Sequence, residues 1–312
     1  MNAETHEGIV FKSTGSWYRV RLADGRFLDC RARGKLKLGA SKITNPVSVG
    51  DEVLIREDVH HPGTGVIQKI NPRKNYVIRK SVHKTAHGHM IAANIDQAML
   101  IVTIKNPRTS LGFIDRFLVS TEAYRIPTIL VFNKLDMYDD ADFIQLEAII
   151  EIYENIGVKC LDISAKKQIG IDKILQVLAH KTTLISGHSG TGKSTLINLL
   201  HPSIDQSIGE VSSFADKGVH TTTFAEMFEI DQDTFVIDTP GIKELGLIDI
   251  ENAELSDYFP EMRALIGECK FHNCSHVHEP KCAVVAAVES GEISSSRYYN
   301  YLSMLEGVDS HR

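Results

Sequence analysis

The residues with the clearest chemical potential lie in the segment 187–195, which reads GHSGTGKST. Gly187 and Gly192 are five positions apart, and Lys193 and Ser194 follow directly. Glycines let backbone N–H groups wrap around a phosphate without interference from Cβ atoms, and the start of a helix adds a favourable dipole. An apolar stretch precedes this motif and a helical pattern follows it, which is the required context. The predicted phosphate-binding loop comprises Gly187, His188, Ser189, Gly190, Thr191, Gly192, Lys193, Ser194 and Thr195.

Two further segments indicate which nucleotide the loop serves. NKLD at 133–136 and SAK at 164–166 each follow an apolar, strand-like stretch. The Asp136 carboxylate can accept hydrogen bonds from both the ring N–H and the exocyclic amine of guanine, a pair that adenine does not offer. A buried carboxylate without a hydrogen-bond partner costs free energy, so a preference for guanine over adenine of order ~10⁴ is attainable. The predicted guanine-binding residues are Asn133, Lys134, Asp136, Ser164, Ala165 and Lys166.

Two polar segments further along the chain supply candidate magnesium ligands. DTPG at 238–241 follows the apolar stretch TFVI, and HTTT at 220–223 lies in the long polar stretch before it. Asp238 suits a water-mediated contact to Mg²⁺, and the Gly241 N–H suits the γ-phosphate. We expect HTTT to form a switch loop in which Thr222, preferred over either neighbouring threonine, closes on the metal. The predicted magnesium ligands are Ser194, Thr222 and Asp238.

The residue after DTPG bears on the rate of hydrolysis. In Ras-like GTPases a glutamine there orients the attacking water, whereas this chain has Ile242, which can neither donate nor accept a hydrogen bond. We therefore expect slow turnover alone and strong stimulation by a partner. His220 could orient water once a partner orders its loop; the alternative is an ordinary surface histidine. The predicted catalytic residues are Lys193, Gly241 and His220.

A second cluster of reactive residues lies near the carboxyl end of the chain. It contains Cys269, Cys274 and Cys282 together with His272, His276 and His278. Three thiolates and one imidazole suit a closed, tetrahedral structural site for one Zn²⁺. The spacing is less regular than paired CxxC motifs, and it leaves the choice of histidine open. The two isolated cysteines, Cys30 and Cys160, are expected to be core residues.

The first part of the chain must form a β-structure. Residues 8–70 alternate apolar and polar side chains around the Asp24-Gly25 turn, and they contain about five strand-like stretches. This pattern resembles an OB-fold barrel; another small barrel, such as an SH3-like one, is the alternative.

The basic residues of this barrel are concentrated at one strand–loop junction, with Trp17 and Tyr18 nearby in sequence. OB barrels often bind nucleic acid through basic grooves and stacking aromatics. A solvated loop and two core aromatics are the alternative. The predicted RNA-binding residues are Arg31, Arg33, Lys35 and Lys37.

The middle of the chain has an α/β pattern. Apolar strands are expected at 97–104, 127–132, 158–163 and 183–186, with helical patterns over 111–118 and 143–153 between them. Alternating strands and helices predict a parallel sheet covered on both faces. From about residue 248 the strand signals cease, and an acidic, helix-prone sequence brackets the cysteine cluster.

Charge is divided unevenly along the 312 residues. Residues 1–80 carry 15 lysines and arginines against 8 aspartates and glutamates, a net charge of +7, whereas the remainder carries 19 against 32, a net charge of −13. The overall value of −6 therefore does not exclude a local contact with a polyanion. No apolar run approaches the ~18 residues of a membrane span, and no export signal opens the sequence. We expect a cytoplasmic, monomeric protein with no membrane partner.

The order of the nucleotide motifs is unusual. A Ras-like GTPase runs phosphate loop, switch threonine, DxxG, NKxD and SAK, whereas this chain runs NKLD, SAK, phosphate loop, HTTT and DTPG. That order predicts a circularly permuted GTPase, which keeps the packed sheet intact if the old termini were close. Residues 242–248 then lead directly into the C-terminal domain, and we expect them to transmit the nucleotide state to it.

A small barrel, a permuted GTPase and a compact cysteine–histidine cluster together resemble the ribosome-small-subunit-dependent GTPase A family (RsgA, also called YjeQ). The resemblance implies an OB-like RNA-binding domain at 1–72, a linker at 73–88, a GTPase domain at 89–247 and a helical zinc-binding domain at 248–312. It also favours His276 as the fourth zinc ligand, beside Cys269, Cys274 and Cys282.

The family resemblance implies a role in late maturation of the 30S ribosomal subunit. The protein would bind the subunit and its rRNA with GTP and leave after hydrolysis to GDP and phosphate. Two alternatives stay open: an RNA-binding reporter of nucleotide state with negligible turnover, and a generic P-loop NTPase.

Overall fold

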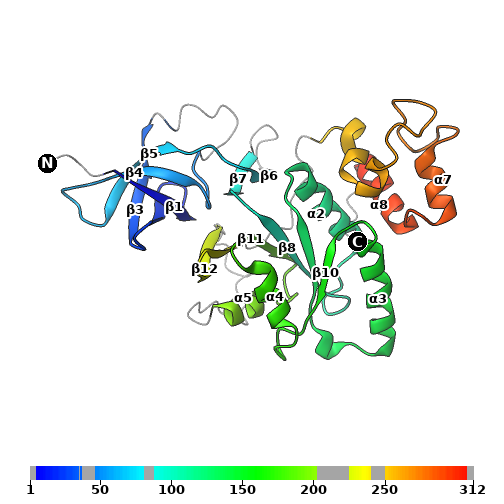
Figure 1. The fold of residues 1–312 in the computed structure, drawn as a ribbon, viewed down its shortest axis with the longest axis horizontal. Helices are drawn as coiled ribbons and strands as arrows, with labels where there is room; N and C mark the ends of the chain where they lie inside the picture. The colour runs from blue at the N-terminus through cyan, green and yellow to red at the C-terminus, as the bar shows by residue number, and fades with distance from the viewer. Residues whose placement is uncertain are drawn as a thin grey trace, which may run out of the picture.

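The computed structural model describes residues 5–34, 36, 46–80, 88–201, 225–239 and 250–307. An N-terminal barrel and a group of C-terminal helices lie at opposite ends of a central α/β domain (Figure 1). The predicted three-part α/β architecture is confirmed.

The barrel is built from five strands that close on themselves. Their order is β1-β2-β3-β5-β4, and β4 pairs back with β1. β3 and β5 run parallel, and the other pairs run antiparallel. This closed five-stranded arrangement is the OB-like barrel that the sequence predicts. The strands are β1 (Thr5–Ser13), β2 (Tyr18–Leu22), β3 (Phe27–Ala32), β4 (Glu52–Glu57) and β5 (Thr64–Ile70).

Alternation of side chains fills the barrel. Val10, Val20 and Ile55 are fully buried in its core, and the residues beside Val20 in β2 and beside Ile55 in β4 are more exposed. A Cβ at Gly8 would lie 2.7 Å from the carbonyl oxygen of Arg21, so only glycine allows β1 and β2 to approach this closely here.

The segment between the barrel and the α/β domain differs from its prediction. Residues 73–88 were expected to form a linker, but β6 (Tyr76–Lys80) lies within them and pairs with β7 (Gly88–Ala93). Val77 is buried in the core of the central domain, which explains why β6 forms within a largely polar segment.

The central sheet has the order β10-β9-β8-β11-β13-β12. All neighbouring strands are parallel except β12, which runs antiparallel to β13. β12 also pairs with β1 at Lys12 and Glu226, so the sheet continues into the barrel. The strands are β8 (Gln97–Val102), β9 (Thr128–Phe132), β10 (Lys159–Asp162), β11 (Thr182–Gly187), β12 (Glu226–Asp231) and β13 (Thr234–Asp238).

Helices cover the two faces of this sheet with two separate apolar cores. Ser110 caps α2 by accepting a hydrogen bond from the Phe113 N–H, and Asp139 with Asp142 forms a capping box at α3. The helices are α2 (Leu111–Ala123), α3 (Asp140–Glu154), α4 (Ile171–Leu178) and α5 (Lys193–Leu200), with the short 3₁₀ segment η1 (Leu135–Met137) after β9. The expected strands and the two expected helical patterns are therefore present, although Phe143 is exposed rather than buried.

The C-terminal part is helical, as expected. It contains η2 (Asn252–Tyr258), α6 (Pro260–Arg263), α7 (Ala283–Ser290) and α8 (Ser295–Leu305). Its own core includes Phe259, Met262 and Tyr301, and it also takes in Val119 from α2 of the central domain. Among the residues that the structure describes, no helix combines the length and apolar character needed to cross a bilayer.

Candidate nucleotide-binding site and metal centre

The predicted nucleotide motifs converge at one edge of the central sheet. β8, β9, β10, β11 and β13 are parallel, so their carboxyl ends meet there, and ligands of such sheets bind at that edge. NKLD follows β9, SAK follows β10, the phosphate loop follows β11, and Asp238 ends β13. The topology thus brings together segments that lie more than 100 residues apart in the sequence.

The phosphate loop requires glycine at two positions for steric reasons. A Cβ at Gly187 would lie 2.6 Å from the carbonyl oxygen of Ile101 on the neighbouring strand β8. Gly192 has a φ of +94°, and a Cβ there would lie 2.3 Å from Nδ2 of Asn133. Both glycines therefore allow the loop to lie directly against the sheet and the NKLD segment before α5 begins at Lys193.

Asn133 joins the phosphate loop to the guanine-recognition segments. Its Nδ2 donates a hydrogen bond to the carbonyl oxygen of Thr191 at 2.8 Å. Its Oδ1 accepts one from the backbone N–H of Ala165 at 2.9 Å. Because Asn133 is buried, these bonds are shielded from competing water and fix the three motifs relative to one another.

The residues expected to contact the base are also brought together. Ser164 donates a hydrogen bond through Oγ to Oδ1 of Asp136 at 2.5 Å, which orients the carboxylate. Lys134 occupies the left-handed region with a φ of +71° and donates from Nζ to the carbonyl oxygen of Asn106. Burial lowers the pKa of Lys134 from its ordinary value. Lys166 is exposed beside this group.

The phosphate-side charges lie close together as well. The Lys193 ammonium forms an ion pair with the Asp238 carboxylate, and both side chains are largely buried. Thr239 donates from Oγ1 to the carbonyl oxygen of Ile185 at 3.1 Å, which holds the start of DTPG against β11. The predicted phosphate-binding lysine and magnesium-binding carboxylate are therefore in contact, and Ser194 follows Lys193 in the first turn of α5.

Several functional predictions lie outside the described residues. They concern the switch and DTPG residues His220, Thr222, Gly241 and Ile242, the segment 242–248, and the barrel residues Lys35 and Lys37.

The loop after β8, which contains Ile104 and Pro107, also contacts the nucleotide motifs, and the sequence did not predict this. Tyr138 donates from its hydroxyl to the carbonyl oxygen of Asn133 at 2.7 Å and accepts from the N–H of Ile104 at 3.0 Å. A Cβ at Gly190 would lie 3.4 Å from Pro107 of the same loop. No spacing in the sequence signals these contacts, because they join the ends of neighbouring strands.

His188 of the phosphate loop has a second unforeseen neighbour. Its ring centroid lies 3.8 Å from that of Phe113, in the first turn of α2, with the planes tilted by 34°. The loop is thus supported from α2 as well as from the sheet.

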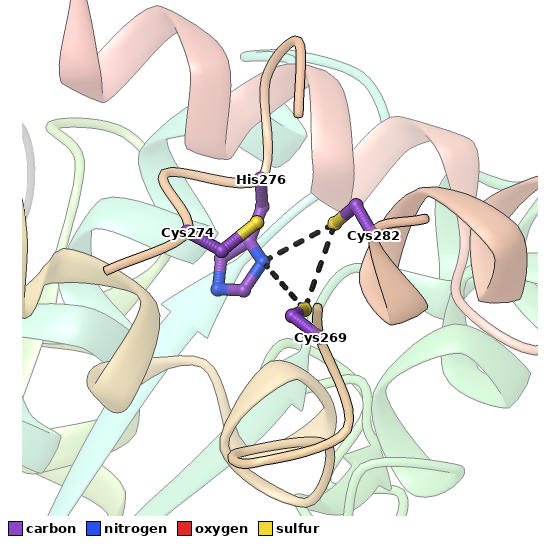
Figure 2. Close-up of side chains that lie close together, drawn as sticks. All are labelled: Cys269, Cys274, His276 and Cys282. Carbon is purple, nitrogen blue, oxygen red and sulfur yellow. Dashed lines mark hydrogen bonds between the residues drawn. The ribbon is translucent and has the colours of Figure 1, made fainter. Parts of the chain in front are cut away.

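The cysteine cluster forms a compact set of donor atoms (Figure 2). The ligand atoms of Cys269, Cys274, His276 and Cys282 all lie within 4.8 Å of one another. Nδ1 of His276 is 3.4 Å from Sγ of Cys282 and 3.6 Å from Sγ of Cys269, and these two sulfurs are 3.9 Å apart. Tetrahedral zinc with Zn–S of about 2.3 Å and Zn–N of about 2.0 Å requires separations of about 3.5–3.8 Å. The separations among Cys269, His276 and Cys282 match these values, and with Cys274 in the same compact set the four residues fit a zinc ion.

The surroundings of the cluster explain the choice of histidine. His276 is buried, whereas His272 and His278 are exposed and do not join the cluster. Tyr298 donates from its hydroxyl to the carbonyl oxygen of His276 at 2.8 Å. Burial lowers the pKa of His276, which favours the neutral imidazole that a metal needs.

Backbone groups support the sulfur ligands. The N–H of Ala283 donates to Sγ of Cys269 at 3.3 Å, and that of Val285 donates to Sγ of Cys282 at 3.5 Å. Such bonds stabilise thiolates, as expected of outer contacts around a metal. Cys30 is buried and Cys160 half-buried, and burial raises the pKa of each thiol to about 12, so both are structural.

Comparison with known proteins agrees with this architecture. The RsgA N-terminal domain model matches residues 7–67, and the RsgA GTPase model matches residues 70–248. The chain belongs to the RsgA GTPase family.

Named relatives of this RsgA-family chain are similar over almost their whole length. It is 51% identical over 306 residues to the small ribosomal subunit biogenesis GTPase RsgA of Cytophaga hutchinsonii, covering 98% of this chain and 100% of the relative. It is 50% identical over 300 residues to the small ribosomal subunit biogenesis GTPase RsgA 2 of Bacteroides thetaiotaomicron, covering 96% of each chain.

Solved structures support the same assignment. YjeQ from Thermotoga maritima matches with a TM-score of 0.79 and 35% identity, covering 99% of this chain and 100% of that one. YloQ, described as a circularly permuted GTPase, matches with a TM-score of 0.75 and 30% identity, covering 99% of this chain and 96% of that one. The predicted circularly permuted fold is therefore confirmed, and membership of the RsgA GTPase family implies GTP hydrolysis with GTP as the substrate.

Proposed function

We propose that this chain is a GTPase that acts in biogenesis of the small ribosomal subunit. The observation that carries the proposal is the pair of Asn133 hydrogen bonds, which join the NKLD segment to the phosphate loop and to the SAK segment. The functional name of relatives about half identical in sequence supplies the cellular process.

In this proposal each motif has a separate role in GTP binding. Asp136, oriented by Ser164, accepts from the guanine ring. The Ala165 N–H would exchange its present bond with Oδ1 of Asn133 for one to the guanine carbonyl. Backbone N–H groups of residues 187–195 surround the phosphates. Lys193 contacts the β- and γ-phosphates, which would replace its present contact with Asp238.

Residues Ser194, Thr222 and Asp238 would hold Mg²⁺, whose charge stabilises the oxygens that develop negative charge during phosphoryl transfer. Gly241 would donate its N–H to the γ-phosphate. Ile242 cannot orient water, so we expect slow hydrolysis alone, with His220 positioned for that task when the subunit orders its loop.

The other two domains would attach the GTPase domain to the ribosomal subunit. The barrel would contact rRNA of the 30S subunit through Arg31, Arg33, Lys35 and Lys37, of which Arg31 and Arg33 are exposed in the described part of the chain. One zinc ion on Cys269, Cys274, His276 and Cys282 would hold the C-terminal domain together. The protein would act as a cytoplasmic monomer that binds the subunit with GTP and leaves after hydrolysis.

The decisive experiment measures GTP hydrolysis by the full chain alone and with isolated small subunits, large subunits and whole ribosomes. Selective stimulation by small subunits is expected. Lys193→Ala should abolish hydrolysis in every condition and serves as the control for contaminating activity. Hydrolysis unchanged by any ribosomal particle would contradict the subunit-dependent role, and binding without turnover would favour a reporter of nucleotide state.

Base specificity is tested separately by competition. ATP should not displace GTP, and Asp136→Asn should shift preference from guanosine to xanthosine nucleotides because the amide reverses one hydrogen bond. Displacement by ATP would favour a generic P-loop NTPase instead.

A further inference from the structure

His188 of the phosphate loop rests against the first turn of α2. Its ring centroid lies 3.8 Å from that of Phe113, which is buried. The carbonyl oxygen of His188 accepts a hydrogen bond from Oγ1 of Thr191 at 2.9 Å, and the carbonyl oxygen of Thr191 accepts one from Asn133. The aromatic contact therefore supports the turn 188–191, whose backbone groups belong to the predicted phosphate site.

The residues that lead into α2 are fixed by local hydrogen bonds. The N–H of Thr103 donates to Oγ1 of Thr109 at 3.2 Å, and the N–H of Thr109 donates back to the carbonyl oxygen of Thr103 at 2.9 Å. Oγ1 of Thr103 donates to the carbonyl oxygen of Pro107. Ser110 caps the helix by accepting from the Phe113 N–H at 3.3 Å. The Phe113 ring is therefore presented to the loop by an anchored helix start.

Another face of α2 carries the C-terminal helices. Asp115, Val119 and Glu122 follow the i, i+4, i+7 spacing of one helix face. Asp115 is fully buried and pairs with Arg297 of α8 at 2.7 Å, and Asn300 of α8 donates to its other oxygen at 2.5 Å. Val119 is buried in the core of the C-terminal part. The packing of these helices on α2 thus depends on the same turn of α2 that supports the phosphate loop.

The helix α8 also holds the loop that carries the zinc ligands. Tyr298 donates from its hydroxyl to the carbonyl oxygen of His276 at 2.8 Å, and Tyr301 donates to that of Ser275 at 2.7 Å. These tyrosines and the residues that bind Asp115 lie on one helix of 11 residues. A continuous series of direct contacts therefore runs from the zinc-ligand loop through α8 and α2 to the phosphate loop.

We propose that Phe113 positions the phosphate loop through His188, and that α2 thereby couples nucleotide binding to the packing of the C-terminal helices. Phe113 and Asp115 are two residues apart, about 3 Å along the helix axis, so the start of α2 cannot move at one contact without moving at the other. This rests on the proposed function and adds a route that is separate from residues 242–248.

The coupling has a physical cause at Asp115. A buried carboxylate that loses partners on α8 gains free energy by turning toward water, and the start of α2 shifts with it. The shift takes the Phe113 ring away from His188 and lowers the fraction of chains whose loop is arranged to bind phosphate, which weakens the apparent affinity. Bound nucleotide in return stabilises the packing of α8 on α2 by the same factor.

Titration of the zinc-loaded full chain with a fluorescent GDP analogue tests the Phe113 contact. Phe113→Leu keeps an apolar side chain but removes the ring, and it should raise the Kd about two- to tenfold, whereas Phe113→Tyr keeps the ring and should bind as the native chain does. Phe117→Leu is the matched control, because Phe117 is a buried phenylalanine of the same core one turn further along α2. An unchanged Kd in Phe113→Leu, or an equal rise in Phe117→Leu, would overturn the proposal.

Hydrolysis stimulated by small subunits separates positioning from a loss of folded protein. In Phe113→Leu the KM for GTP should rise while kcat stays unchanged, because the ring acts on binding and not on bond cleavage. A fall in kcat with an unchanged KM would overturn the positioning role.

A double-mutant cycle tests the route through α2. Asn300→Ala removes one partner of Asp115 while Arg297 remains, and it should weaken binding of the GDP analogue in the native chain but not further in Phe113→Leu. Arg263→Ala, which removes the exposed pair with Glu122 of α2, is the control and should leave the Kd unchanged. No effect of Asn300→Ala on the native chain, or an equal effect in both backgrounds, would overturn the proposal.

Hydrogen exchange measures the reverse effect. Saturating GDP should slow amide exchange in α8 of the native chain and should not do so in Phe113→Leu. Exchange in α8 that is unaffected by GDP in the native chain would overturn the coupling. A native chain that binds no guanine nucleotide would refute the proposed function itself, whereas equal binding by the native chain and Phe113→Leu would refute this inference alone.

Discussion

The central domain is joined to its two neighbours by contacts of opposite character. On the barrel side, Lys12 pairs with Glu226 at 2.9 Å and Arg21 pairs with Glu229 at 3.0 Å, and all four side chains are between 27% and 40% exposed. On the C-terminal side, Arg297 is 2% exposed and pairs with the fully buried Asp115 at 2.7 Å.

The C-terminal junction is a complete buried network. Asp115 also accepts hydrogen bonds from Tyr153 at 2.9 Å and from Asn300 at 2.5 Å. Glu261 accepts two bonds from Arg297, at 2.6 and 3.0 Å. Burial opposes the charge of Arg297, but the carboxylates of Asp115 and Glu261 outweigh that cost and raise its pKa.

The barrel junction has a different anchor. Phe11 of β1 is buried in the core of the central domain, with its ring centroid 5.9 Å from that of Phe235. Added salt screens the exposed ion pairs, so at high salt the barrel junction depends on the buried Phe11 ring. The charges of the buried network at the C-terminal junction are shielded from salt.

The barrel junction also contains main-chain bonds, from the Ala93 N–H to the Val49 carbonyl and from Asn94 Nδ2 to the Gly50 carbonyl, and Val49 is buried in the central core. Main-chain and apolar contacts therefore hold the barrel, whereas a buried ion-pair network holds the C-terminal helices.

The largest effect is expected from removing the metal. Chelation of zinc, or Cys282→Ser, should unfold the C-terminal helices, because a structural zinc site contributes of order 10 kcal/mol to a unit of this size. Hydrogen exchange across residues 250–307 should rise, while exchange in the barrel should not. Atomic spectroscopy of the native chain should give one zinc per chain, and full retention of protection after chelation would contradict the assignment.

The next effect concerns the buried network. Arg297→Ala leaves Asp115 and Glu261 without their partner and should lower the free energy of unfolding by about 3–5 kcal/mol. Chemical denaturation measures this loss. Arg263→Ala is the matched control, since Arg263 pairs with Glu122 at a surface where both side chains are exposed by a third or more, and it should cost less than about 1 kcal/mol. Equal losses would mean that the network is not what holds α8 to α2.

Replacing the apolar anchor tests the other junction. Phe11→Ala should cost about 3 kcal/mol through loss of buried surface and the cavity left behind. The effect should be local. Amide hydrogen exchange should increase in β1 and β12, and the C-terminal helices should stay protected from exchange. A loss of protection in α8 would show that the two junctions are coupled.

The exposed ion pairs should give the smallest effect. Lys12→Ala or Arg21→Ala should change the free energy of unfolding by less than about 1 kcal/mol, and the difference from the native chain should shrink further in 0.5–1 M salt because exposed charges are screened. Denaturation at two salt concentrations measures it. A loss as large as that of Arg297→Ala would remove the contrast between the junctions.

Local sequence patterns were sufficient for much of the fold. The strand before the phosphate loop, the helix after it and the caps of α2 and α3 depend on residues within a few positions of one another. The prediction of residues 73–88 as a linker was incomplete because the short run YVIRK is stabilised as a strand by pairing with β7 and by burial of Val77. β12 was missed because half of its residues are acidic, and its place in the sheet depends on pairing with β13 and β1.

The chemistry of the site divides in the same way. Residue type and spacing alone determined that 187–195 could surround a phosphate, that Asp136 could select guanine and that the cysteines could hold zinc. Only the tertiary structure decided that Asn133 bridges two motifs, that Tyr138 supports it, that His276 rather than His272 or His278 joins the cysteines, and that Trp17 is exposed while Tyr18 is buried. The reason is physical: chemical capacity belongs to a side chain and its near neighbours, whereas burial, orientation and partners depend on contacts between segments that the sequence separates.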